Sequence, residues 1–162
     1  MRSFDSGGSG PDRAIRQTVD TPTERAWISD RGSLLIRQPV PWVLLFVETG
    51  HLQAEFAPYI IEAYERATGV GRMRPDVFVD CERLVTYDGE IRRQPSQWIA
   101  DNRHRIRVQH MLVRSRFTRM GLQLASLFLG GVIVGHHERR TFEQAMREAT
   151  LREEDETPAA IG

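Results

Sequence analysis

The sequence predicts a single α/β domain with a mainly parallel or mixed sheet of four to five strands and four helices. Short apolar runs alternate along the chain with segments in which apolar residues recur at helical spacing. Strands that alternate with helices need crossover connections, and crossovers place the strands parallel in one sheet. A length of 162 residues with 40% hydrophobic residues suits one domain with its own core.

The expected strands differ in how deeply they are buried. The run VLLFVET, Val43–Thr49, is typical of a strand buried on both faces. Ala26–Pro39 indicates a short strand or hairpin edge with Gly32 at a turn. Further strands are expected at Asp76–Leu84, Arg105–Ser115 and Val132–His137.

Four segments have helical spacing. They are His51–Gly69, Asp88–Asn102, Arg116–Gly130 and Arg139–Glu154. Gly69 is a natural C-cap of the first, and Pro58 is expected to kink it. Pro95 is expected to divide the second helix, with Ser96 as the N-cap of a second piece.

The ends of the chain have a different composition from the middle. Residues 1–25 are rich in Gly, Ser, Pro, Asp and Thr and predict a disordered tail, while residues 153–162 form an acidic flexible tail. The folded domain is therefore expected at residues 26–152. No signal peptide is recognisable, and the apolar run Met120–Val134 is too short to span a bilayer. A single cysteine, Cys81, fits a reducing, cytoplasmic compartment, and an edge strand near the N-terminus makes a homodimer conceivable.

The stretch LVTYDGEIR, Leu84–Arg92, places a carboxylate and a glycine where a strand gives way to a helix. This element and the order of strands and helices over Ile28–Thr150 resemble the STAS domain of the anti-sigma-factor antagonists, the SpoIIAA-like fold. Members carry Asp-Ser-Ser-Gly or Asp-Thr-Ser-Gly at this helix start. Here Asp88-Gly89-Glu90 stands at that place, so Asp88 matches the acidic residue and the next two residues replace the hydroxyl residues.

The resemblance implies a non-catalytic regulatory domain that binds a protein partner. In the family a serine in this loop is phosphorylated by a partner kinase, and the added charge expels a binding partner. Since Gly89 has no hydroxyl, the switch is expected to be absent. Glu90 either imitates a permanently phosphorylated loop or is only a carboxylate favoured by the helix dipole. The simpler interpretation of Asp88 is a helix cap, in which its side chain accepts a hydrogen bond from the amide of Glu90 or Ile91.

A stretch without acidic residues extends from Asn102 to His137. It contains six arginines: Arg103, Arg105, Arg107, Arg114, Arg116 and Arg119. The last three cluster after a strand, where a positive site can take a phosphate, a carboxylate, a lipid headgroup or an acidic protein surface. The alternative is a solvated arginine face paired with Glu55, Glu62 and Glu65. A formal net charge of zero gives no reason to expect nucleic acid as a partner.

No other residue pattern predicts a cofactor, a metal or a catalytic centre. His136 and His137 are adjacent on an extended segment, so they face opposite ways and do not bind one metal together. Cys81 adjoins a strand, and buried cysteines are usually inert. The predicted partner-binding residues are Asp88, Gly89, Glu90, Ile91, Arg114, Arg116 and Arg119. The alternative function is a small-molecule or lipid carrier of the related CRAL-TRIO fold, and the third is an unrecognised enzyme.

Overall fold

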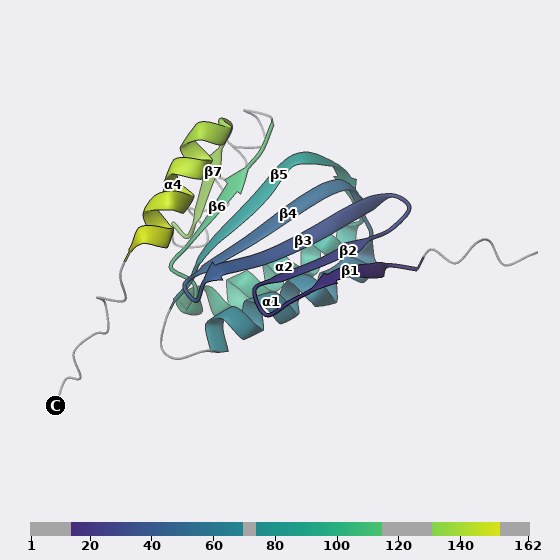
Figure 1. Cartoon of the computed structure of the whole chain (residues 1–162), viewed down its shortest axis with the longest axis horizontal. Coiled ribbons are helices and arrows are strands. Elements are labelled where there is room, and N and C mark those ends of the chain that lie inside the picture. The colour runs from purple at the N-terminus through teal and green to yellow at the C-terminus, as the bar shows by residue number, and fades with distance from the viewer. Residues whose placement is uncertain (1–13, 70–73, 115–130, 153–162) are drawn as a thin grey trace, which may run out of the picture.

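The computed structural model describes residues 14–69, 74–114 and 131–152, which form a seven-stranded mixed sheet with strands in chain order (Figure 1). The strands are β1 (Arg16–Asp20), β2 (Glu24–Ile28), β3 (Gly32–Val40), β4 (Val43–Leu52), β5 (Asp76–Tyr87), β6 (Val108–Leu112) and β7 (Ile133–His136). The helices are α1 (Ala57–Gly69), α2 (Gly89–Asn102) and α4 (Arg139–Leu151), with short 3₁₀ helices η1 (Ala54–Phe56) and η2 (Arg103–Arg105).

The sheet has an antiparallel half and a parallel half. Strands β1 to β4 pair antiparallel, whereas β4 to β7 pair parallel. Helices α1 and α2 lie on one face of the sheet, and α4 lies on the other face near β6 and β7 (Figure 1). Of the two sheet types expected from the sequence, the mixed sheet is therefore the correct one.

Two apolar clusters hold these layers together. The larger joins the sheet to α1 and α2, where the Tyr64 ring lies 5.2 Å from Phe46 and stacks 4.8 Å from Trp98. The smaller cluster lies under α4 and consists of Val43, Leu45, Phe78, Leu112, Phe142 and Ala149. Strand β4 is thus buried on both faces, as the apolar run Val43–Thr49 predicted.

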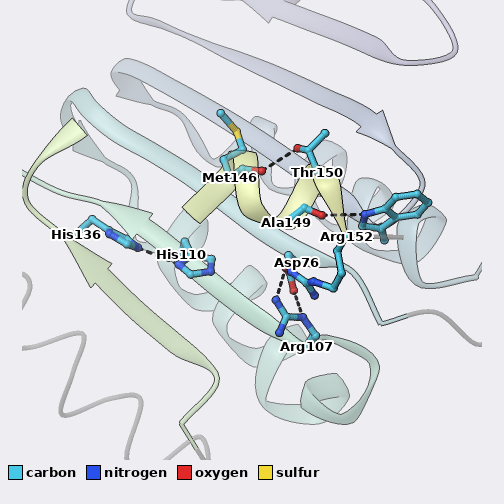
Figure 2. A network of polar contacts seen from close by, with 9 residues as sticks. Asp76, Arg107, His110, His136, Met146, Ala149, Thr150 and Arg152 are labelled. Atoms are coloured by element: carbon cyan, nitrogen blue, oxygen red, sulfur yellow. Dashed lines mark hydrogen bonds and ion pairs between the residues drawn. The ribbon is translucent and has the colours of Figure 1, made fainter. Parts of the chain in front are cut away.

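Polar contacts fasten the end of α4 to the sheet (Figure 2). Asp76 is 1% exposed, and its carboxylate accepts from Arg107 and from Arg152 at 2.5 Å each. The indole of Trp42 donates to the carbonyl oxygen of Ala149 at 2.9 Å. A buried carboxylate with two guanidinium partners is far less costly than an unpaired one. Because one of these partners, Arg152, directly follows α4, the ion pair also holds the end of that helix against the sheet.

The described sheet has more strands than the four to five expected. Strand β1 and the start of β2 lie within residues 1–25, where a disordered tail was expected. The side chains of β1 are mostly exposed, so they lack the apolar alternation that marks a half-buried strand; antiparallel pairing with β2 supplies the order instead. The expected strand Ala26–Pro39 is the β2–β3 hairpin, with its turn before Gly32.

The bounds of two further strands also differ from the prediction. Strand β5 continues to Tyr87 because β4 extends beside it to Leu52. Strand β6 is shorter than Arg105–Ser115, since Arg103–Arg105 forms η2 and β6 begins at Val108.

Both prolines lie within helices that remain whole. Pro58 is in the first turn of α1, where the missing N–H has no intrahelical partner to lose, so the expected kink is wrong. Pro95 lies inside an undivided α2, so Ser96 is not an N-cap. Buried Trp98 and Ile99 follow the proline and anchor that helix to the core. The predicted helix Arg116–Gly130 lies outside the described residues.

Candidate functional site

The loop from β5 into α2 places Asp88 at the predicted helix start. Gly89 is the first residue of α2, and Asp88 has the extended backbone of an N-cap. Its side chain makes no capping hydrogen bond to α2, so the predicted bond to the amides of Glu90 or Ile91 is wrong. Instead one carboxylate oxygen accepts from the Ala54 amide at 2.9 Å, and the other lies 2.8 Å from Nε2 of His51. The Ala54 hydrogen bond, with His51, lowers the pKa of Asp88. Asp88 thus fastens this loop to the end of β4.

Glu90 carries a carboxylate that is bound by its own helix, whereas Gly89 borders open space. The Glu90 carboxylate accepts from Arg93 at 2.6 Å and from Gln94 at 2.9 Å, and these bonds lower its pKa to about 2. It is therefore ionised at neutral pH and held by its own helix. A Cβ added to Gly89 would meet open space, because nothing lies within 4 Å of it.

The arginines of the acid-free stretch do not act as one group. Arg105 pairs with Glu65 at 3.2 Å and Arg107 pairs with Asp76, so both are structural. Arg103 and Arg105 lie on η2, before β6 begins. Arg114 follows β6 and is exposed. The positions of Arg116 and Arg119 lie outside the described residues.

A cavity of about 1030 Å³ brings part of the predicted site together. Its lining includes Gly89 and Ile91 from α2 and Arg114 from beyond β6. Asp88 and Glu90 are not part of this lining: the first is directed to the end of β4 and the second pairs along α2. Of the described residues predicted for partner binding, three therefore share one cavity, while the two carboxylates lie outside its lining.

Sequence reasoning missed the polar groups at the cavity wall. Glu48 of β4 is 8% exposed, and the Cys81 thiol of β5 donates to its Oε2 at 3.3 Å. The Tyr64 hydroxyl donates to Oε1 of Gln109 in β6 at 3.0 Å. Burial raises the pKa of Glu48 to about 7 and raises the pKa of Cys81 well above its ordinary value. The available signal was Glu48 itself, a carboxylate inside a run expected to be buried on both faces.

Comparison with solved structures identifies the architecture. An uncharacterised protein of the DUF3478 family from Shewanella loihica PV-4, described as having a SpoIIAA-like fold, superposes with a TM-score of 0.53 at 12% identity. The match covers 86% of this chain and 98% of that one. The chain has a SpoIIAA-like fold. The anti-sigma factor antagonist SpoIIAA in its unphosphorylated form also superposes with a TM-score of 0.53 at 12% identity, over 74% of this chain and 99% of that one.

The sequence comparisons add nothing to this structural likeness. No family model matches the sequence, and no curated protein matches it. The expected SpoIIAA-like fold is therefore confirmed by the structural likeness alone, which at this identity concerns the fold and not the activity.

In this SpoIIAA-like fold the histidines near β7 have packing roles. Nδ1 of His110 lies 2.9 Å from Nε2 of His136, and the His110 ring stacks 4.6 Å from Phe78. Burial, with the nearby His136, lowers the pKa of His110 to about 4, so it is neutral at physiological pH. His137 lies 3.5 Å from the Glu138 carboxylate.

Residues 14–69, 74–114 and 131–152 contain no group of three side chains suited to hold a metal ion.

Within the described ranges, no helix is both long and apolar enough to cross a bilayer.

Proposed function

We propose that this domain is a non-catalytic regulatory module that binds a protein partner through the loop Asp88–Ile91 and the neighbouring Arg114. The observation that carries the proposal is the SpoIIAA-like fold combined with Asp88-Gly89-Glu90 at the start of α2. Arg116 and Arg119 belong to the same predicted surface by sequence and lie outside the described residues. A cytoplasmic location remains a prediction from the single cysteine.

The geometry of the loop supports a docking role. Asp88 holds the backbone of the loop through Ala54 and His51, so the first turn of α2 is presented in a fixed position. The exposed pair of Glu90 and Arg93 adds one negative and one positive charge beside it. Gly89 is exposed and Asp88 and Glu90 are partly exposed, whereas Ile91 is 7% exposed and anchors the turn in the core. A fixed, charged turn favours binding because little conformational entropy is lost when a partner docks.

Gly89 allows the proposal to be tested through charge alone. Because an added Cβ meets nothing within 4 Å, serine and aspartate both fit at this position. Gly89→Asp places a negative charge where the resembled family receives a phosphate, whereas Gly89→Ser adds a hydroxyl without charge. If this loop contacts the partner, Gly89→Asp weakens binding and Gly89→Ser largely preserves it.

The test is quantitative affinity capture from the native host, followed by mass spectrometry. The immobilised forms are the unaltered protein, Gly89→Asp, Gly89→Ser, Asp88→Ala and Glu90→Ala. Glu148→Ala is the matched control, because Glu148 is exposed on α4 at the opposite face of the sheet. Circular dichroism checks that each variant is folded.

We expect one captured protein to bind the unaltered chain and the variants Gly89→Ser and Glu148→Ala. The same protein should be lost from Gly89→Asp, Asp88→Ala and Glu90→Ala. Retention of every captured protein by Asp88→Ala, Glu90→Ala and Gly89→Asp alike would show that the loop is not the docking surface.

The cavity favours a second candidate function, a carrier or sensor of a small molecule. Its volume of about 1030 Å³ reaches the upper end of ordinary ligand pockets, about 300–1,000 Å³. The expected lipid headgroup or anionic molecule at Arg114 belongs to this candidate. Native mass spectrometry of protein from its own host tests it, and only a bound small molecule supports it.

A further inference from the structure

The cavity beside α2 has largely apolar walls. Its lining includes apolar residues of the sheet and of α1 and α2, of which all but Met111 are buried: Phe46, Ile60, Val79, Ile91, Ile99 and Met111. Walls of this kind bind the hydrocarbon part of a ligand by removing it from water. The walls alone would accept many apolar molecules, so the polar groups among them decide the ligand class.

Polar side chains of three neighbouring strands face this cavity, and three of them form one row across the sheet, while Thr86 and Tyr87 lie farther along β5. The row consists of Glu48 of β4, Cys81 of β5 and Gln109 of β6. Strand alternation places Glu48 on the same face as Phe46, and Cys81 on the same face as Val79. Glu48 is 8% exposed and Gln109 is 4% exposed. Burying such groups costs free energy that an apolar residue would not cost, which marks this row as more than core packing.

The charges around the row are unequal. The Tyr64 hydroxyl already donates to Gln109, and the Cys81 thiol already donates to Glu48. Asp80, which pairs with Arg139 at 2.8 Å, further raises the proton affinity of the Glu48 carboxyl beyond the effect of burial. The arginines of the described lining, Arg92, Arg93 and Arg114, are exposed. The buried end of the cavity therefore favours a group that donates hydrogen bonds or carries positive charge.

We infer that the cavity binds an apolar molecule with one primary amine, whose ammonium group donates to the Glu48 carboxylate. The ammonium group gives the buried Glu48 carboxylate a positively charged partner. Ion pairing and the removal of the ligand's hydrocarbon chain from water therefore both favour the bound state. A carboxylate ligand of the same length would place a second negative charge beside Glu48, which lines the cavity. The inference is independent of the partner-binding proposal, since purified protein alone suffices to test it.

The experiment uses three probes that share a hydrocarbon chain: n-octylamine, n-octanol and octanoate. Each is titrated calorimetrically into the full chain at about pH 7 in two buffers that differ in ionisation enthalpy, which measures proton release. The variants are Glu48→Gln, which keeps the size of the side chain, and Glu55→Gln, a matched change at an exposed glutamate. We expect the unaltered protein and Glu55→Gln to bind octylamine at least about tenfold more tightly than octanoate. Glu48→Gln should lose that preference.

Proton release gives a second readout that needs no variant. Since the Glu48 pKa is about 7, binding of an ammonium should expel up to roughly half a proton per ligand at neutral pH. Equal or tighter binding of octanoate, undiminished octylamine binding by Glu48→Gln, or no proton release would overturn the inference. Failure of all three probes to bind would overturn it as well, whatever the partner-capture experiment shows.

Discussion

The substitution Glu48→Gln should make the protein more stable at about pH 8 and leave its stability nearly unchanged at about pH 4. Burial raises the pKa of Glu48 to about 7, so the folded chain holds this proton more tightly than the unfolded chain. Between the ordinary value of 4.5 and about 7, the unfolded state therefore binds fewer protons, and the Glu48 contribution to stability falls as pH rises. Glutamine has no proton to lose and resembles the protonated carboxyl in shape.

The size of the effect follows from the same shift. Each tenfold change in proton affinity corresponds to about 1.4 kcal/mol, so the rise from 4.5 to about 7 corresponds to an upper limit of about 3 kcal/mol. The thiol bond from Cys81 persists in both forms of residue 48, because glutamine also offers an oxygen acceptor. We expect Glu48→Gln to gain on the order of 2 kcal/mol at about pH 8, which is a large fraction of the stability of a small domain.

Urea unfolding followed by tryptophan fluorescence at the two pH values measures this directly. Glu55→Gln, at an exposed site, is the control and should show no comparable change with pH. An equal free energy of unfolding for the unaltered protein and Glu48→Gln at about pH 8 would refute the reasoning, because Glu48 would then carry no buried penalty.

Three further outcomes follow from described contacts. Cys81 should react with iodoacetamide far more slowly than a free thiol at about pH 8, because burial and Glu48 raise its pKa, and Glu48→Gln should speed the reaction. Asp76→Asn should destabilise the protein by about 3 kcal/mol and Arg152→Gln by less, because Arg107 still pairs with Asp76; urea unfolding ranks them. Gly89→Ser should raise the free energy of unfolding by up to about 0.5 kcal/mol, since its side chain meets open space, and a loss of stability would contradict this.

The sequence predicted the order of the principal elements because each has a local signature. The apolar run of β4 and the start of α2 at Gly89 follow from patterns within a few residues. Strand β1 has no such signature, since its exposed side chains owe their order to pairing with β2. The same limit applied to Asp88: its position was predictable, but its partners His51 and Ala54 lie on the far side of a crossover.

The row of Glu48, Cys81 and Gln109 depends both on local alternation within each strand and on the register between strands. Glu48 was visible as a carboxylate in an apolar run, and alternation alone places it on the face of Phe46. Cys81 and Gln109 join it only because β4, β5 and β6 pair parallel, with Phe46 opposite Val79 and Val77 opposite Gln109. Register depends on contacts across the whole sheet, so the local pattern of a single strand does not predict it. The carboxyl that results is half-ionised near neutral pH without a ligand, and an ammonium partner would lower its pKa again. Stability measurements on Glu48→Gln therefore give the free-energy cost of burying Glu48, and the amine titration shows whether a ligand offsets it.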